Sequence, residues 1–141
     1  MKILLVLALT LAMVSVSIAH EKATPDDARS TPAYEVLVLR RVAVTAELGD
    51  RRERLTSEHP DVRRVADELR LLNVEIERIA TIESSQLSKL TAVYGRLILK
   101  RVALQVEANE LRHQYIAGYP LLRQKQRELS ALEFEIESLL R

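Results

Sequence analysis

The sequence predicts an all-α protein built from two tandem helical hairpins that pack as a helical bundle or coiled coil. Apolar residues recur at three- and four-residue spacing through most of the chain, which is the spacing of one helix face. Only three glycines and four prolines interrupt the 141 residues. The hydrophobic residues, 48% of the chain, are mostly aliphatic, because aromatic residues make up only 4%. This composition suits helix packing better than a ligand pocket.

Residues 1–19 predict a secretory signal peptide. One positive charge at Lys2 precedes an apolar run over residues 3–18, and Ser17 and Ala19 supply the small residues of a cleavage site. The run is slightly shorter than the ~20 residues of a membrane-spanning helix, so we favour cleavage after Ala19 over retention as an anchor. We therefore expect a periplasmic or secreted protein that meets a membrane only through an uncleaved signal segment or a partner.

Residues 20–31 predict a short flexible leader, since they are polar and show no periodicity. The first helix is expected to follow directly, because Thr31 offers a capping hydroxyl and Pro32 suits the first helical position. Residues 34–44 are also rich in the β-branched side chains of strands. We favour helix there because turn residues are almost absent and the residues from Ala43 onward favour helix.

A proline interrupts each hairpin and defines a helix-break motif. The motif residues are His59 and Pro60 in the first hairpin and Gly118, Tyr119 and Pro120 in the second. Proline lacks an N–H and disfavours helical backbone at the preceding residue, so one helix ends and the next begins at each break. Gly118 is expected to end its helix in the left-handed conformation.

The second helix of each hairpin carries a narrow apolar stripe. Residues 62–79 alternate apolar positions by three and four, as in a coiled-coil seam, and residues 122–139 repeat the pattern with Lys125 as the exception. Residues 82–91 join the hairpins without Gly or Pro, so one long helix could continue through them. We favour a bend or short turn because serines in this segment offer helix caps.

A 60-residue internal repeat underlies the two hairpins. Repeat 1, residues 34–81, aligns without a gap with repeat 2, residues 94–141, and 16 of the 48 pairs are identical. The break prolines, Pro60 and Pro120, form one of these pairs. The sequence therefore predicts a duplicated helical-hairpin domain over residues 32–141.

The first helix of each hairpin is apolar almost all round and needs several neighbours. We expect the two first helices to pack together with the second helices flanking them, or the chain to oligomerise. The candidate packing and interaction residues on the first helices are Leu37, Leu39, Val42, Leu97, Leu99 and Val102. Those on the second helices are Leu69, Leu72, Ile76, Leu129, Leu132 and Ile136.

Charged residues are expected mainly on solvated faces. Pairs four residues apart, Glu47 with Arg51 among them, favour helix. The basic pairs at 40–41 and 100–101 are expected either to extend their charged heads into water or to form ion pairs with Glu47 and Glu107 or with an acid of a partner. The Glu-Ile-Glu segments at 75–77 and 135–137 each place one carboxylate beside the seam and the other toward solvent, and we interpret them as part of a solvated face rather than as catalytic acids.

The sequence argues against catalysis and cofactor binding. The chain has no Cys, and its three His residues form no pair at metal-ligand spacing, so we expect no metal site. It contains neither a glycine-rich phosphate loop nor a nucleophile motif. A net charge of +1, with basic residues matched by acids, argues against nucleic-acid binding.

One segment of the first hairpin resembles the periplasmic coiled coil of chain-length determinant proteins, the polysaccharide co-polymerases of bacterial polysaccharide export. It begins with residues 55–62 (LTSEHPDV) and continues through Glu68, Leu69, Leu72, Glu75 and Ile76. The second hairpin departs from the pattern with Tyr119 in place of His59, and the two membrane spans of that family are missing. The resemblance implies a helical, extracytoplasmic and assembly-prone protein associated with the envelope or with polysaccharide export.

Together these features predict a secreted or periplasmic scaffold or adaptor that acts through protein–protein contacts. The expected partner is another protein or a second copy of the chain, since a homo-oligomer would cover the apolar helices. The alternative is a periplasmic chaperone or stress sensor that binds unfolded clients.

Overall fold

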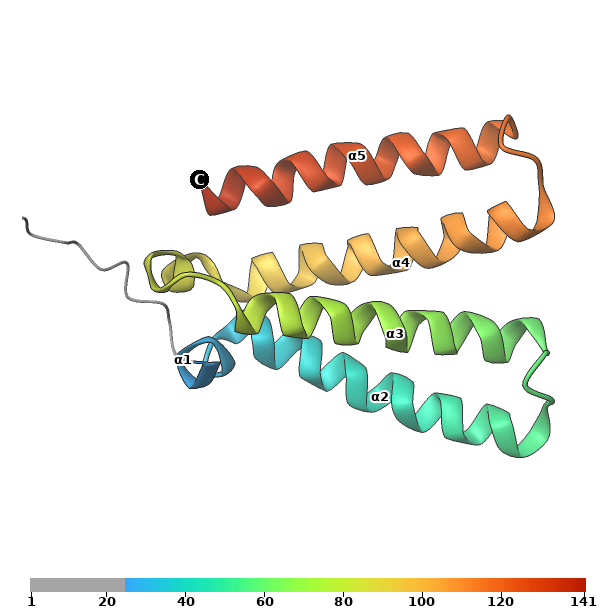
Figure 1. Ribbon diagram of the computed structural model, residues 1–141, viewed down its shortest axis with the longest axis horizontal. Helices are drawn as coiled ribbons and strands as arrows, with labels where there is room; N and C mark the ends of the chain where they lie inside the picture. Colours follow the sequence, from blue (N-terminus) through green and yellow to red (C-terminus); the bar gives the residue numbers. More distant parts are fainter. Residues whose placement is uncertain (1–24) are drawn as a thin grey trace, which may run out of the picture.

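The computed structural model describes residues 25–141, and this part of the chain is all-α. The elements are α1 (Pro25–Arg29), α2 (Pro32–Arg54), α3 (Pro60–Ala80), the short 3₁₀ helix η1 (Ser84–Lys89), α4 (Ala92–Gln114) and α5 (Pro120–Leu140) (Figure 1). The predicted fold class is confirmed. The strand alternative for residues 34–44 is wrong, because they lie inside α2. The predicted signal peptide lies outside the described residues.

The end of the predicted leader is instead a structured cap on the first hairpin. Residues 25–29 form α1, and Ala28 is fully buried. Thr31 caps α2 as predicted, since its hydroxyl accepts a hydrogen bond from the Tyr34 N–H at 3.4 Å. The same hydroxyl donates to the Ala28 carbonyl at 2.7 Å and so ties α1 to α2. The composition of this segment gave no sign of that tertiary packing.

The first helix break lies where the sequence predicts it. α2 ends at Arg54, and Leu55 has an extended backbone. Pro60 is the first residue of α3, and the Nδ1 atom of His59 accepts a hydrogen bond from the Asp61 N–H at 3.2 Å. His59 therefore satisfies one of the free donors at the start of α3.

The second break follows the same plan with a different detail. α4 ends at Gln114, Tyr115 is extended, and Pro120 begins α5. The Tyr115 and Tyr119 rings stack with centroids 3.9 Å apart. The left-handed conformation expected at Gly118 is wrong, since no described glycine has a positive φ. Extended Tyr115 already ends the helix, so a left-handed residue is not needed.

The elements of the two hairpins have matching bounds. α4 begins and ends 60 residues after α2, and α5 begins and ends 60 residues after α3. The bend expected in residues 82–91 is confirmed, because η1 and its non-helical flanks separate α3 from α4. A short helical segment thus precedes each hairpin: α1 packs on α3, and η1 packs on α5.

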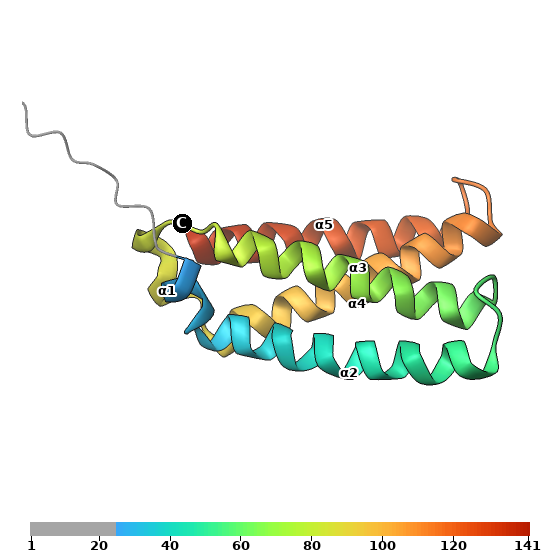
Figure 2. The same ribbon diagram turned by 60° about the horizontal axis from the view of Figure 1, so that its bottom comes forward.

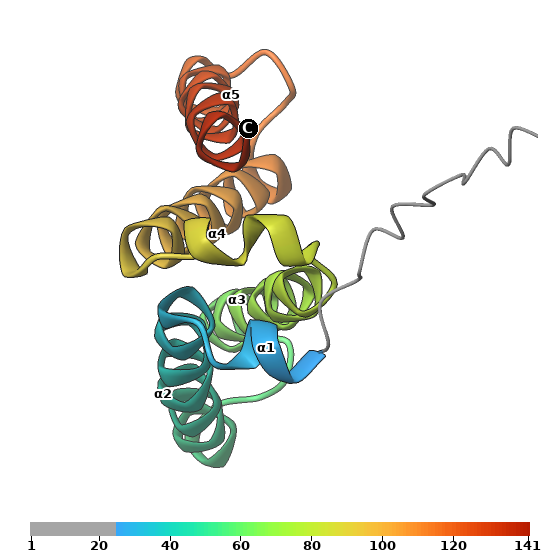
Figure 3. The same ribbon diagram turned by 90° about the vertical axis from the view of Figure 1, so that its left-hand side faces the viewer.

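α4 is the central helix of the bundle. It packs along α5 on one side and against both α2 and α3 on the other (Figures 1 and 3). Within the described chain α5 packs substantially only on α4 and η1. The expectation that both first helices are central therefore holds only for α4, whereas α2 lies at the edge. In this stack of two hairpins α3 and α4 lie inside, whereas α2 and α5 lie at the two edges.

α2 and α4 meet most closely near their N-termini. A Cβ atom on Gly95 would lie 3.0 Å from both the Cα and the carbonyl oxygen of Ala33, so only glycine fits without displacing backbone. The Ala33 N–H donates to the Leu90 carbonyl at 3.1 Å. The two helices separate toward the other end of the molecule (Figure 2).

Candidate interaction surfaces

The predicted packing residues divide into core, half-buried and exposed positions. Those in the core are Leu37, Leu72, Ile76, Val102, Leu129, Leu132 and Ile136. Leu69, Leu97 and Leu99 are half-buried against it. Leu39 and Val42 are 63% and 61% exposed, so they do not pack within the chain. Both lie on the side of α2 that no helix of residues 25–141 covers.

These two residues belong to an exposed apolar surface that we name the α2 stripe. It consists of Leu39, Val42, Ala43, Ala46 and Gly49, all exposed, whose spacing keeps them on one helix face. The small side chains at its end permit a second helix to approach closely. The sequence pattern identified the apolar character of this face but not which of the two first helices would expose it.

The contact between the hairpins contains a largely buried ion pair. The Arg101 guanidinium donates to the Glu75 carboxylate, and Glu75 is only 8% exposed. Arg78 lies 3.5 Å from the same carboxylate. The prediction of a solvated carboxylate is therefore wrong for Glu75. The expected partner of the second basic pair was Glu107, which is instead 2.8 Å from Lys125 on α5.

Sequence spacing could not reveal the Arg101–Glu75 pair, because its residues come from different hairpins. Of the expected local pairs, Glu47–Arg51 is present at 2.5 Å. Arg40 of the first basic pair reaches Glu68 on α3 at 2.7 Å, not Glu47. Both basic pairs thus supply one arginine that joins neighbouring helices.

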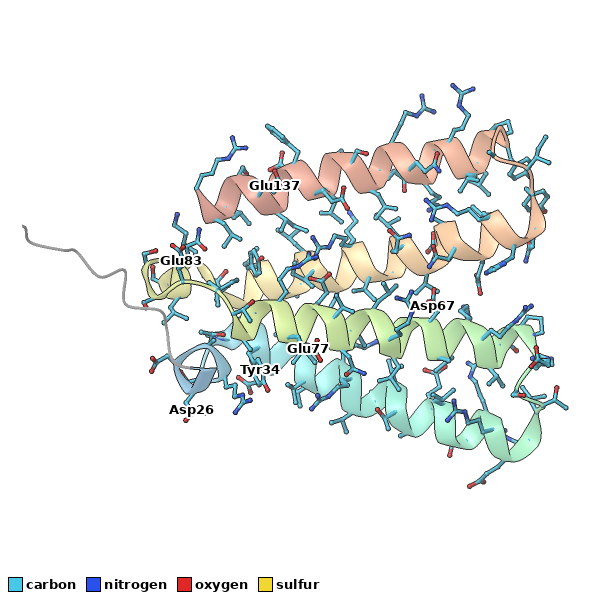
Figure 4. The ribbon with its side chains drawn as sticks, viewed as in Figure 1. Asp26, Tyr34, Asp67, Glu77, Glu83 and Glu137 are labelled. Atoms are coloured by element: carbon cyan, nitrogen blue, oxygen red, sulfur yellow. The ribbon has the colours of Figure 1, made fainter. Side chains whose placement is uncertain are left out.

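Polar contacts continue the contact between the hairpins toward the breaks. The Asn109 amide donates to Asp67 at 2.6 Å, and Arg64 lies 3.6 Å from Glu110. Asp67, labelled in Figure 4, thus lies on the side of α3 that faces α4. At the other end, burial raises the pKa of the Tyr94 phenol above its ordinary value, an effect that the nearby Arg101 partly offsets.

Comparison with protein-family models, with curated proteins and with solved structures gives no significant match. The function must therefore be argued from the surfaces of this chain alone.

An open cleft of about 770 Å³ separates α3 from α4 near the helix breaks. Its walls carry the basic residues Arg63, Arg64, Arg70, Arg112 and His113, with Asp67 and Glu110 as the acids. Arg64, Asp67 and Glu110 already form the contacts across the cleft that join the hairpins. The cleft is thus mainly the region where the two hairpins separate.

The helix-break motif residues flank this end of the molecule. His59 and Tyr119 are half-buried, whereas Pro60, Gly118 and Pro120 are exposed. His59 and Tyr119 occupy the same cap position, but only His59 makes a side-chain capping hydrogen bond. The prolines of the motif therefore begin α3 and α5, as predicted, and proline is the one residue type that the two copies of the motif share.

The part of the chain from residue 25 onward shows neither a metal-binding cluster nor a membrane span. No group of three or more His, Asp or Glu side chains in it could hold a metal ion. None of its helices is long and apolar enough to cross a membrane. The α2 stripe and the contact between the hairpins are the features on which a function can be argued.

Proposed function

We propose that this chain is an extracytoplasmic helical scaffold or adaptor that binds a protein partner through the α2 stripe. The observation that carries the proposal is the exposure of Leu39 and Val42, at 63% and 61%, on a helix whose other face forms the core. An exposed apolar face with small residues is the surface on which another helix packs well. Burial of this face would stabilise the complex in proportion to the apolar area removed from water.

The duplicated hairpin is part of the proposal. The 16 identical pairs among 48 positions support it, as do the helix bounds that differ by 60 residues throughout. Thr31 and Thr91 also cap α2 and α4 in the same way. A scaffold built from repeated hairpins gains binding surface by stacking equivalent units.

The extracytoplasmic location rests on the signal-peptide pattern in residues 1–19. The resemblance of residues 55–62 and the following heptads to chain-length determinant proteins favours an envelope partner, and polysaccharide export is the process we propose for it. Location is tested by N-terminal sequencing of the protein recovered from the periplasm and medium. We expect the mature chain to begin at His20, and a product beginning at Met1 in the cytoplasm would contradict the proposed location.

The partner-binding proposal is tested by crosslinking in the native host with the variant Val42→Asp. A charge in the middle of the α2 stripe should abolish the crosslinked species without unfolding the protein, as judged by circular dichroism. Ile116→Asp is the matched control, since Ile116 is 84% exposed in the turn between α4 and α5. Crosslinks that survive Val42→Asp would contradict the proposal.

A chaperone function is the second candidate, favoured by the combination of the α2 stripe and the open cleft between α3 and α4. An extended unfolded segment could contact both surfaces. It predicts that the purified protein suppresses the aggregation of a model client and that Val42→Asp removes this effect. A protein that leaves client aggregation unchanged would exclude it.

A further inference from the structure

We propose that the partner of the α2 stripe is a second copy of this chain, docked head to tail on the uncovered side of α4 and α5. This inference rests on the proposed function and names its partner. Inside the chain, the second hairpin docks α4 against α2 and α3 of the first. The same contact repeated between molecules would place α2 of one copy against α4 and α5 of the next.

The docking face of α4 has an exposed counterpart on α2. Gly95, Val102 and Asn109 are spaced by seven residues, and Gly95 and Asn109 contact the first hairpin. Sixty residues earlier, Val42 and Gly49 occupy equivalent positions on α2. Val102 is 3% exposed and Val42 is 61% exposed, so the same face is covered in one hairpin and uncovered in the other.

The receiving surface is also uncovered in the second hairpin. α2 and α3 receive α4, whereas their counterparts α4 and α5 receive no helix among residues 25–141. Val93 and Leu139, on α4 and α5, are 54% and 44% exposed. Their counterparts in the first hairpin, Ala33 and Ile79, are buried. The uncovered surface therefore carries exposed apolar side chains that a docked helix would cover.

Charged residues at the two uncovered surfaces match the internal contact. Arg101 and Glu75 pair between the hairpins, and their counterparts Arg41 and Glu135 are the same residue types. Neither Arg41 nor Glu135 forms an ion pair with another described residue. In the head-to-tail contact, Arg41 of one copy would meet Glu135 of the next.

The contact between two copies would also bring opposite charges together at two further places, where the contact between the hairpins has other residues. At the close crossing, Glu35 replaces Gly95 and Arg96 replaces Val36, so the copies cannot approach as closely but gain opposite charges.

Near the breaks, the internal contacts Arg64–Glu110 and Asp67–Asn109 have Gln124–Asp50 and Arg127–Gly49 as their counterparts, so Asp50 of one copy would lie near Arg127 of the next. The charges along the docking face of α2 are therefore negative, positive and negative, at Glu35, Arg41 and Asp50. Those on the receiving face of α4 and α5 have the opposite signs, at Arg96, Glu135 and Arg127. Such complementarity sets both register and orientation.

The two surfaces differ from each other, so the contact is heterologous and does not close at two copies. It generates a growing stack, or a ring where the rotation per copy permits closure. A stack of this kind continues the helical repeat of the chain from one molecule to the next.

The test is sedimentation velocity of the purified protein over a concentration series, with charge-reversal variants. We expect the parent to exceed two copies, and Arg41→Glu and Glu135→Arg to remain monomeric when measured alone. An equimolar mixture of these two variants should associate again, because every contact in it then joins opposite charges. Arg63→Glu and Glu133→Arg, which lie outside the two surfaces, are the matched controls and should associate like the parent.

The other outcomes overturn the inference and separate it from the proposed function. A dimer that tolerates Glu135→Arg would indicate a symmetric contact between two α2 stripes. A parent that stays monomeric, with Val42-dependent crosslinks to another protein, would overturn the second copy as partner and leave the scaffold function in place. A monomeric parent whose crosslinks are unchanged by Val42→Asp would overturn both the second copy as partner and the proposed binding through the α2 stripe.

Discussion

At the residue scale, Glu75 shows how an apparently solvated carboxylate becomes part of the core. In the sequence Glu75 lies beside an apolar seam. In the fold its carboxylate faces α4 and accepts a hydrogen bond from Arg101. A buried charge is tolerated when it is paired and hydrogen-bonded, and it is costly when one partner is removed.

We predict that Glu75→Ala lowers the free energy of unfolding by about 2–4 kcal/mol, because it leaves the largely buried Arg101 without its partner. Urea unfolding followed by circular dichroism measures the effect. Glu77→Ala is the matched control at an exposed position of α3 (labelled in Figure 4), with an expected change within about 0.5 kcal/mol. Equal effects of the two substitutions would show that the Arg101–Glu75 pair does not stabilise the contact between the hairpins.

Gly95 is a second residue whose role comes from a neighbouring helix. We predict that Gly95→Ala destabilises the protein by about 1–3 kcal/mol, because the new Cβ would meet the Ala33 backbone at 3.0 Å. Gly49→Ala is the control, since a Cβ there meets nothing within 4 Å and Ala favours helix by about 0.5–1 kcal/mol. Thermal unfolding of the two variants should shift in opposite directions, and a shift in the same direction would contradict the packing at Gly95.

At the element scale, the sequence was most informative where a single residue type dictates backbone geometry. Pro60 and Pro120 placed the starts of α3 and α5, and Thr31 with Pro32 placed the start of α2, because caps and prolines act locally. α1 was missed because its burial depends on contact with α3. Gly118 was misassigned since the helix before it ends earlier, at Gln114.

The helices also differ in how much of their surface is covered. α5 packs mainly on α4, whereas α4 is enclosed by α2, α3 and α5. Segments with fewer tertiary contacts open more readily. We predict faster amide hydrogen exchange in the middle of α5 than in the middle of α4 when the protein is monomeric. Equal protection of the two helices would show that the chain opens only as one cooperative unit.

At the scale of the whole molecule, the sequence predicted the two hairpins but not the asymmetry of their packing. The identical pairs between the two hairpins, such as Val42 with Val102, implied equivalent roles. In a stack of two units the equivalence cannot hold, because only one copy of each face has a neighbour. The candidate surface follows from this incomplete stack, and periodicity alone did not show which copy of each face is left uncovered.

Salt provides a test at this scale. The uncovered surfaces carry complementary charges, and ions screen exposed charges beyond roughly 8 Å at physiological ionic strength. We therefore predict that the average mass of the associated protein falls as sodium chloride is raised from about 50 to 500 mM. An association that strengthens with salt would instead indicate that apolar burial alone drives it.

The close contact between α2 and α4 at Gly95 has a mechanical consequence for the far end of the bundle. From residue 95 to the end of α4 at residue 114 the helix extends roughly 29 Å at 1.5 Å per residue. A rotation of about 5° at the crossing would move that end by roughly 2.5 Å on this length. Such a rotation would stretch the Asn109–Asp67 and Arg64–Glu110 contacts, which join the hairpins near that end, so the width of the cleft depends on how closely the helices pack at Gly95.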